Sequence, residues 1–433
     1  MERAVPIDEI RTKIGLRERA LAYPREGLLF QLGIAVVCLH VVDDNFLQPN
    51  PGISAVDHVV SGLVPLALLA AAGLLYGRVR AGARATITLL AGFFGVLAGT
   101  EAVQYTRTVG PSGDDYTGLL SIPAGLLLLG LGIRTLWRSR RTGGRLWWRY
   151  LRRVLLLVGT VYVAVAVLFP VAISYVVTHA ARAEVPRADL AAAYEDVAFR
   201  TEDGLRLEGW YIPSRNGAAV ISFPGRGSSQ KRAKLLARHG YGVLLFDRRG
   251  EGESEGDPNA FGWQGERDIH AAVAFLQRRP DVDPDRIGGI GLSVGGEMMI
   301  EAAAESSALK AIVSEGASGR SVRDDLANPG SAWDEVLATG VVTVATAVFT
   351  NNLPPRPLKR LVPQISGAVF FVYGERGQPA ERPANRAFYS AARGSKEIWE
   401  VPGSKHIGGT EAQPAEYERR VTAFFDRELL PRG

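Results

Sequence analysis

Five long apolar stretches dominate the first 180 residues of the chain. Each contains at most one charged residue, and they lie at 27–42, 59–76, 85–105, 116–133 and 154–177. A helix needs about 20 apolar residues to cross about 30 Å of hydrocarbon, and most of these stretches come close to that length or exceed it. The pattern predicts an α-helical transmembrane bundle of about five spans over residues 27–180, preceded by a charged tail over residues 1–26.

The spacing of apolar positions changes after residue 180. Short β-rich runs alternate with amphipathic helical runs, which is typical of an α/β domain with a mostly parallel sheet. We expect eight strands, at 197–201, 205–212, 219–223, 242–246, 287–292, 311–314, 369–373 and 397–401. Helices are expected near 231–239, 265–278, 296–306, 384–392 and 415–430. Residues 181–200 are assigned to a linker and the first strand, and residues 201–433 to the α/β domain.

One insertion interrupts this alternation between the sixth and seventh strands. It covers about residues 316–367 and contains Trp333 and the apolar run from Val336 to Phe349. That run of 14 residues is too short to cross a bilayer. Two interpretations stay open: a small lid that covers an apolar pocket or lies on the membrane surface, and a cap helix that simply packs on the domain.

Charge distinguishes the two parts of the chain. Residues 1–184 carry 19 Lys/Arg and 12 Asp/Glu, whereas the remaining residues carry 31 and 33. A nucleic-acid-binding domain needs a basic face, so the slightly acidic second part disfavours that class of protein. The single cysteine, Cys38, excludes an internal disulfide framework and a cysteine-based zinc cluster.

The cations of the first part gather in alternate loops. Six precede the first span, three join the second and third, and seven, from Arg138 to Arg153, join the fourth and fifth, whereas the other two loops together hold only Arg107. Cytoplasmic loops are enriched in Lys and Arg, so the N-terminus is predicted to be cytoplasmic. Five crossings then place the α/β domain outside the cytoplasm, in a multi-pass protein of the cell membrane. The charged tail and the lack of a small-residue cleavage site argue against a cleaved signal peptide.

A few polar residues lie within or beside the predicted spans. Glu101 and Gln104 are in the third span, and His40, Asp43 and Asp44 are near the outer end of the first. An ionisable group at membrane depth is costly and is by default a functional candidate. No run of such residues marks a proton or ion path, so we expect Glu101 to pair with another helix or to lie near the interface.

Ser293 is the predicted nucleophile. It is the serine of a G-x-S-x-G pattern, with Gly291 and Gly295 on either side, between a predicted strand and a predicted helix. A sharp strand–turn–helix bend lifts a hydroxyl above the sheet edge, and side chains at the flanking positions would clash with neighbouring backbone. The N–H groups at the start of the following helix point toward any oxyanion formed there.

Together with two further motifs, this bend resembles the alpha/beta-hydrolase superfamily, especially its dienelactone-hydrolase-like, acyl-CoA-thioesterase-like and serine-aminopeptidase-like esterase branches. The resemblance runs from Thr201 to the C-terminus. The segment 224–227 (PGRG) is similar to the superfamily's HG-x loop, with Pro224 in place of histidine, and 247–254 (DRRGEGES) is similar to its D-x-R-G-x-G-x-S turn. By this resemblance the oxyanion hole consists of the backbone N–H groups of Val294 and Arg226.

His406 is the predicted general base. Of the three histidines in the second part, His239 ends a predicted helix and His270 is in the middle of one, and both are expected to be surface or packing residues. His406 lies between the last strand and the C-terminal helix, where the superfamily keeps its catalytic histidine. A neutral imidazole there can take the serine proton and return it to the leaving group.

The orienting acid is open among three glutamates. The superfamily usually places it about three residues after the glycine that closes the seventh strand, here Gly374, but that position is Gly377. Glu381 lies on the loop before the next helix and can turn back toward His406, so we favour it. Glu315, after the sixth strand, and Glu375 are the alternatives.

These features predict a membrane-anchored serine hydrolase that cleaves an ester, thioester or related acyl bond with a Ser293–His406–Glu381 triad. No metal or organic cofactor is implied. The expected partners are a small-molecule or lipid-like acyl substrate and membrane lipids, with no nucleic acid. Two alternatives remain: a catalytically weak sensor or scaffold coupled to the bundle, suggested by the glycine at 377 and by Glu101, and a transacylase that uses the same triad.

Overall fold

The computed structural model describes residues 7–108, 110–138, 145–327, 333–431 of the chain. These form two compact units, one of Met1–Pro49 and Ser54–Ala164 and the other of Asn50–Ile53 and Val165–Gly433. Arg3, part of the basic loop (139–144) and part of the insertion (328–332) lie outside the described residues. Each unit is described by itself below.

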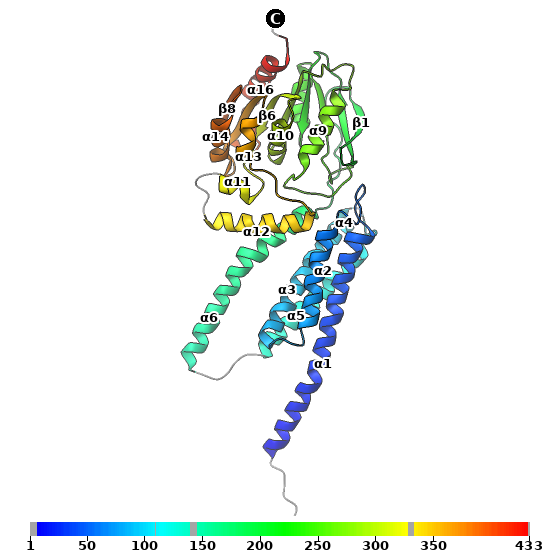
Figure 1. The fold of residues 1–433 in the computed structure, drawn as a ribbon, viewed down its shortest axis with the longest axis vertical. Helices are drawn as coiled ribbons and strands as arrows, with labels where there is room; N and C mark the ends of the chain where they lie inside the picture. The colour runs from blue at the N-terminus through cyan, green and yellow to red at the C-terminus, as the bar shows by residue number, and fades with distance from the viewer. Residues whose placement is uncertain (1–6, 109, 139–144, 328–332, 432–433) are drawn as a thin grey trace, which may run out of the picture. The chain divides into compact units, whose positions relative to one another are not determined.

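The first unit is helical (Figure 1). Its elements are α1 (Ile7–Val42), a π-helical turn (Asp43–Leu47), α2 (Val59–Leu75), α3 (Ala81–Ala98), α4 (Thr100–Thr108), α5 (Asp115–Arg138) and α6 (Leu146–Val163). A second π-helical turn (Ala164–Leu168) continues α6 into α7 (Phe169–Thr178), which belongs to the second unit. The helix α1 extends back to Ile7, into the segment predicted as a tail.

Four helical stretches are long and apolar enough to cross a membrane. They are Arg25–Leu47, Ala81–Arg107, Asp115–Arg138 and Leu146–Thr178. The first span, predicted from only 16 apolar residues, therefore lies in a helix of 23. The shorter apolar helix is instead α2, with 17 residues, so the number of crossings depends on whether α2 is one of them.

Glycines let α3 and α5 approach closely within this unit. A Cβ atom at Gly92 would lie 2.8 Å from the carbonyl oxygen of Gly125, and one at Gly125 would lie 2.7 Å from that of Gly92. The hydroxyl of Ser121 donates a hydrogen bond of 2.7 Å to the carbonyl of Gly95 across the same interface. Small residues and inter-helix hydrogen bonds of this kind hold membrane helices together, where the hydrophobic effect does not.

The polar residues near the end of α1 are paired with residues of other helices. The buried His40 ring lies 3.1 Å through Nε2 from the carbonyl oxygen of Ala98, and Thr117 donates to Asp43 at 2.8 Å. Glu101 is half-buried on α4, and it also has an interaction partner. None of this assigns a transport role to the bundle.

The second unit contains the predicted eight-stranded sheet. Its strands are β1 (Glu195–Arg200), β2 (Arg206–Ile212), β3 (Ala219–Phe223), β4 (Gly242–Phe246), β5 (Ile287–Leu292), β6 (Leu309–Glu315), β7 (Ala368–Arg376) and β8 (Lys396–Lys405). The order is β1-β2-β4-β3-β5-β6-β7-β8. The two pairs that involve β2 are antiparallel and all other pairs are parallel, which confirms the expectation of a mostly parallel sheet.

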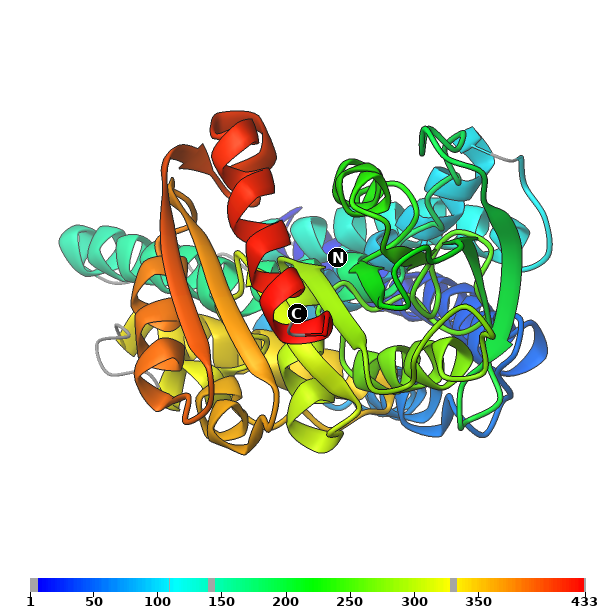
Figure 2. The same ribbon diagram turned by 90° about the horizontal axis from the view of Figure 1, so that it is seen from above.

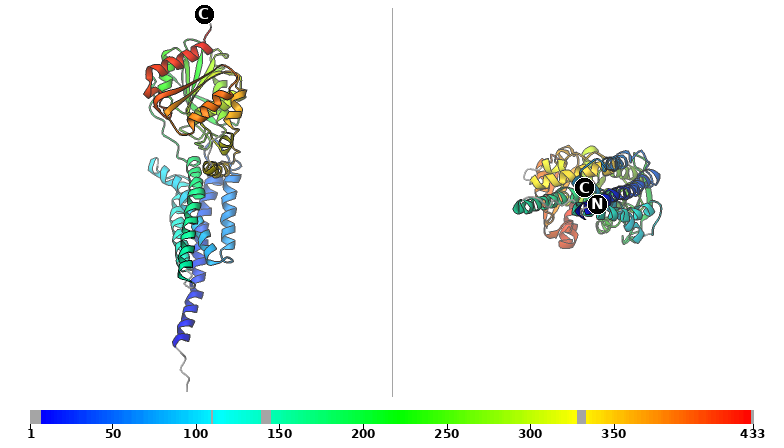
Figure 3. Two further views of the ribbon diagram at one scale, coloured as in Figure 1. Left: turned by 90° about the vertical axis from the view of Figure 1, so that its left-hand side faces the viewer. Right: turned by 90° about the horizontal axis from the view of Figure 1, so that it is seen from below.

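Helices cover both faces of the sheet. The helices α8 (Gln230–Arg238) and α16 (Pro414–Leu429) pack on one face, and α9 (Gly265–Leu276), α10 (Val294–Glu305) and α14 (Glu381–Ala391) pack on the other. Figure 2 and the left view of Figure 3 show α16, in red, and α14, in orange, on opposite sides of the strands. Such a three-layer arrangement brings the carboxyl ends of the parallel strands to one edge, where the loops carry the candidate site.

The insertion after β6 forms three helices. They are α11 (Val322–Ala327), α12 (Trp333–Thr350) and the short α13 (Leu358–Leu361), followed by a 3₁₀ turn (Val362–Gln364). The helix α12 has 18 residues, so it extends beyond the apolar run that predicted it. It packs against α7, and α13 packs into the core beside α10. A short helix α15 (Gly409–Ala412) precedes α16.

Candidate active site

Ser293 lies at the bend between β5 and α10. Its backbone has φ 52° and ψ −124°, outside the regions that residues with a side chain normally occupy. Such a conformation costs about 1–3 kcal/mol and persists only where the surroundings hold it. One such contact is the hydrogen bond of 2.7 Å from the Ser293 N–H to the carbonyl of Glu315.

The flanking glycines are required by space. A Cβ atom at Gly291 would lie 2.7 Å from the Cα of Gly296, and one at Gly295 would lie 2.6 Å from Cδ of Pro224. Real Cβ atoms do not approach other atoms this closely, so any larger residue would displace the bend. The sequence pattern G-x-S-x-G therefore has the structural cause that was expected.

The imidazole of His406 lies between Ser293 and Glu381. Nε2 is 2.9 Å from Oγ of Ser293, and Nδ1 is 2.6 Å from Oε1 of Glu381. His406 directly follows β8, and its side chain is about a quarter exposed. The three groups come from three separate loops at the carboxyl edge of the sheet, and the structure brings them into one hydrogen-bonded row.

Glu381 is the first residue of α14, and its side chain is fully buried. Besides His406, its Oε1 accepts a hydrogen bond of 2.6 Å from the backbone N–H of Gln378. A Cβ atom at Gly377 would lie 2.7 Å from Cδ of Glu381. The carboxylate of Glu381 thus fills the space that a side chain at position 377 would take, which gives a physical reason for the glycine at that position.

The two alternative acids contact other groups. Glu315 is buried and accepts hydrogen bonds from Arg232 at 2.9 Å and Tyr417 at 2.7 Å. Glu375 is exposed and accepts a hydrogen bond of 2.7 Å from the N–H of Gly403. Among the described contacts, the hydrogen bonds of Glu315 and Glu375 go to groups other than His406, and the buried ion pair of Glu315 with Arg232 has a structural role.

The other two histidines lie elsewhere in the second unit. Nε2 of His239 is 3.0 Å from Oε1 of Glu418 on the surface. Nε2 of His270 is 3.3 Å from the carbonyl of Ala302, at the packing contact of α9 with α10. These positions agree with the surface and packing roles expected for them.

The two predicted oxyanion donors differ in what they contact. Val294 is the first residue of α10, where backbone N–H groups have no acceptor within the helix. The N–H of Arg226, by contrast, donates a hydrogen bond of 2.8 Å to Oδ1 of Asp247. In this conformation the Arg226 N–H is therefore not available to a substrate oxygen.

Asp247 and Arg226 form a buried ion pair beside the candidate nucleophile. The guanidinium of Arg226 contacts Oδ2 of Asp247 at 2.6 Å and Glu253 at 2.8 Å. Burial raises the pKa of Asp247, and the hydrogen bonds and charge of Arg226 oppose that rise without cancelling it. Sequence reasoning placed the two residues in separate motifs and missed their contact, although an arginine and an aspartate that follow the adjacent strands β3 and β4 were a signal for it.

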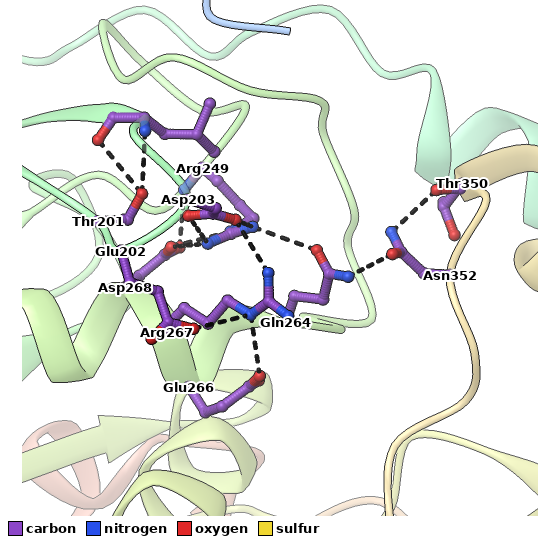
Figure 4. Close-up of polar contacts among 11 residues, drawn as sticks. Thr201, Glu202, Asp203, Arg249, Gln264, Glu266, Arg267, Asp268, Thr350 and Asn352 are labelled. Atoms are coloured by element: carbon purple, nitrogen blue, oxygen red, sulfur yellow. Dashed lines mark hydrogen bonds and ion pairs between the residues drawn. The ribbon is translucent and has the colours of Figure 1, made fainter. Parts of the chain in front are cut away.

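Arg249, from the same turn as Asp247, holds a second network (Figure 4). Its guanidinium donates to Asp268 at 2.8 Å, to Asp203 at 2.9 Å and to Gln264 at 3.3 Å. Gln264 in turn donates to Asn352, just after α12. The D-x-R-G-x-G-x-S turn thus connects the segment after α12 to the core rather than supplying a reactive group.

Glu297 is a buried acid on the helix that follows Ser293. Its Oε1 accepts hydrogen bonds of 2.8 Å from the backbone N–H groups of both Ser318 and Gly319 at the start of the insertion. Burial raises the pKa of Glu297 to about 7, against the opposing charge of Arg320. Among the residues that the structure describes, no group of three or more His, Cys, Asp or Glu side chains could hold a metal ion.

Comparisons with known proteins agree with this fold. Residues 175–385 match the family of X-Pro dipeptidyl-peptidases (S15 family). The thiohydrolase aneE of Aspergillus aculeatus is 36% identical over 129 residues, 28% of this chain and 41% of that protein. The polyketide transferase grgF of a Penicillium species is 38% identical over 117 residues, 25% of this chain and 40% of that protein. The chain thus spans about two fifths of the length of these curated relatives.

The structure of the Pyrococcus furiosus esterase Pf2001 is also similar. It is 23% identical, with a TM-score of 0.48, and the match covers 57% of this chain and 97% of the esterase. The family match begins at residue 175, near the end of the last apolar helix, Leu146–Thr178. The second unit of the chain has the alpha/beta-hydrolase fold, and it is joined to an N-terminal region of apolar helices that are long enough to cross a membrane.

Proposed function

We propose that the protein is a membrane-anchored serine hydrolase that cleaves an ester, thioester or related acyl bond. The observation that carries the proposal is the row of hydrogen bonds from Ser293 Oγ through the His406 ring to the buried Glu381, at 2.9 and 2.6 Å. A nucleophile, a base within hydrogen-bond reach and a third group that orients the base are the arrangement required for acyl transfer through a covalent intermediate.

In the proposed reaction, Oγ of Ser293 attacks the substrate carbonyl while Nε2 of His406 takes the hydroxyl proton. Glu381 keeps the ring in the tautomer with Nδ1 protonated and stabilises the imidazolium that forms. The N–H of Val294 stabilises the charge that develops on the carbonyl oxygen. His406 then returns the proton to the leaving alcohol or thiol, and a water molecule, activated by the same ring, releases the acid.

A transacylase is the second candidate, because grgF is a polyketide transferase and aneE a thiohydrolase. The two reactions share the acyl-enzyme and differ in whether water or another nucleophile accepts the acyl group. The sensor or scaffold alternative loses one of its reasons, since Glu381 occupies the space left by Gly377 and contacts His406.

A fluorophosphonate probe tests the proposal directly. The full-length protein in detergent should be labelled at a single serine, and peptide mass spectrometry should identify that residue as Ser293. Labelling depends on a serine made nucleophilic by its base. Absence of labelling, or labelling at another serine, would rule out the proposed nucleophile, and pre-incubation with short acyl esters and thioesters would show which class competes.

We also propose five spans, with the N-terminus in the cytoplasm and the hydrolase outside it. The cations in alternate loops support this orientation. A second support is the loop between the first two apolar helices, part of which belongs to the second unit. There the N–H of Gly256 donates a hydrogen bond of 2.9 Å to the carbonyl of Pro51, and Asn50 donates to Asp257 at 3.1 Å. This loop and the hydrolase share a side of the membrane only if the helices between them make an even number of crossings, which requires α2 to cross.

Cysteine accessibility tests this topology. In a Cys38→Ala background, Val56→Cys, Gly77→Cys and Arg393→Cys each place one thiol at an exposed position. A membrane-impermeant maleimide on intact cells should label the cysteines at 56 and 393, and should label that at 77 only after permeabilisation. A four-span protein would instead label the cysteines at 56 and 77 together and leave that at 393 unlabelled.

A further inference from the structure

The helix α12 has an apolar exposed side, and its buried side carries two threonines beside Ala345. Trp333, Leu337 and Val344 are 85%, 50% and 66% exposed, whereas Thr343 and Thr346 are buried. With the half-exposed Val341 and Val348, the outward residues recur every three or four positions and form one stripe, which we call the α12 stripe. From residue 336 to residue 350 the helix has no charged side chain.

The buried threonines are held by hydrogen bonds, so the orientation of α12 is determined by its contacts. Oγ1 of Thr343 accepts a hydrogen bond of 2.9 Å from the N–H of Val322, and Oγ1 of Thr346 lies 2.7 Å from Oγ of Ser174 on α7. In water, a helix lowers its free energy by turning its apolar side inward. An apolar row turned outward marks a surface that contacts a protein or a membrane.

The segments before and after α12 contact the core of this unit. Before it, Arg320 donates to the carbonyl of Gly262 at 3.0 Å and forms a buried ion pair with Glu301. After it, Figure 4 shows Asn352 in contact with Gln264, which contacts Arg249. These contacts connect the segments that flank α12 to the core.

The neighbour of α12 indicates which partner covers the stripe. Phe349 packs edge-on against Tyr175 of α7, with ring centroids 5.3 Å apart. The helix α7 is the end of the continuous apolar helix Leu146–Thr178, which has 33 residues. At 1.5 Å per residue that helix is about 50 Å long, more than the thickness of about 30 Å of the hydrocarbon core. If this helix crosses the membrane, its last turns extend beyond the hydrocarbon core, and a helix that packs on them lies near the boundary between lipid and water.

The same end of α7 lies close to the candidate catalytic residues. The N–H of Ala260 donates a hydrogen bond of 3.0 Å to the carbonyl of Val177. Two residues further on, a Cβ atom at Gly262 would lie 2.7 Å from Cγ2 of Val294. The insertion itself leaves the sheet at Gly316, where a Cβ atom would lie 3.1 Å from Cε1 of His406.

We propose that the α12 stripe lies in the lipid surface of the membrane, and that the site takes acyl substrates whose chains reside in that surface. The part of this proposal that concerns substrates rests on the proposed hydrolase function. The lipid contact does not, because it follows from the apolar stripe and from the packing of α12 on the last membrane helix. Amphiphiles with one or more long acyl chains are the substrate class that this placement selects.

Fluorescence quenching by lipid tests the contact without using catalysis. The full-length protein with Cys38→Ala and Val344→Cys is labelled with an environment-sensitive fluorophore and placed in phosphatidylcholine/phosphatidylglycerol nanodiscs. Lipids with a doxyl quencher near the headgroup should quench the label strongly. A label at Arg393→Cys, an exposed residue before β8 at the opposite edge of the sheet, is the matched control and should be unaffected. Equal quenching at both positions, or none at 344, would overturn the proposal. No quenching at 344 is the result expected if a second copy of the chain or a protein partner covers the α12 stripe instead of lipid.

Substrate chain length tests the second part. The variant Val344→Asn should lower kcat/KM for a long-chain acyl ester presented in vesicles by about tenfold, since burial of a valine side chain stabilises contact with lipid. Hydrolysis of a soluble short-chain ester should not change, which also shows that the variant is folded. An equal loss for both esters would contradict the proposal. Quenching at 344 without turnover of any ester would leave the lipid contact standing and refute the hydrolase function.

Discussion

Replacement of Ser293 by alanine is expected to lower kcat for any acyl substrate by about 10⁶-fold, because the covalent route is lost and only substrate binding and oxyanion stabilisation remain. Replacement of His406 by alanine should have a similar effect, since its Nε2, 2.9 Å from Oγ, is the proposed base. The double variant should be no slower than either single one, because the two groups act as a unit.

Initial rates with a chromogenic short-chain ester measure this loss, and circular dichroism shows whether the variants fold. Ser390→Ala, an exposed serine on α14 away from His406, is the matched control and should keep full activity. Activity of Ser293→Ala within tenfold of the parent protein would mean that the reaction does not pass through this hydroxyl.

The second large effect is expected at Glu381. The isosteric Glu381→Gln should lower kcat by about 10⁴-fold, because an amide can hold the ring in the wrong tautomer and cannot stabilise the imidazolium. The structure adds a sharper expectation for Gly377→Ala. One methyl group at that position would lie 2.7 Å from Cδ of Glu381, so it should displace the carboxylate from His406 and reduce kcat while the residues of the site stay the same.

The converse variant is Gly377→Asp combined with Glu381→Ala. It moves the acid to the position usual in the superfamily and removes the side chain that fills the space, so it should recover at least about tenfold of the activity lost in Glu381→Ala alone. Single-turnover kinetics of the parent protein, Glu381→Ala and the double variant measure the recovery. An unchanged rate in Gly377→Ala, or in Glu381→Gln, would remove Glu381 from the proposed triad.

The central strands could be predicted from the sequence because they are buried and bounded by turn residues, whereas their order in the sheet was not predicted. The predicted 219–223, 242–246 and 287–292 match β3, β4 and β5 without change. The predicted seventh and eighth strands were too short. The strand β7 continues past Gly374 to Arg376, and β8 continues past Val401 to Lys405. Arg376 pairs with Lys405 beyond a register shift, which the spacing of apolar residues does not reveal.

The candidate site could be predicted only in part. Ser293 lies in a local motif and His406 is one of three histidines, so both could be chosen from the sequence. The position of Glu381 depends on the free space next to Gly377. The hydrogen bond of the Arg226 N–H depends on the side chain of Asp247, 21 positions further along the chain. For α12 the length of the apolar run predicted a helix, but only its contacts with Val322 and Ser174 show that the threonines face inward.

The hydrogen bond between the Arg226 N–H and Asp247 bears on how the first chemical step would depend on temperature. A backbone N–H donates well to one acceptor at a time, so an anionic intermediate on Ser293 would gain this donor only after the Asp247 carboxylate has been displaced from it. Rupture of a charge-assisted bond in a buried setting absorbs heat before any covalent change. Acylation that recruits this second donor would therefore have a large activation enthalpy and a steep Arrhenius plot, whereas acylation that uses Val294 alone would not.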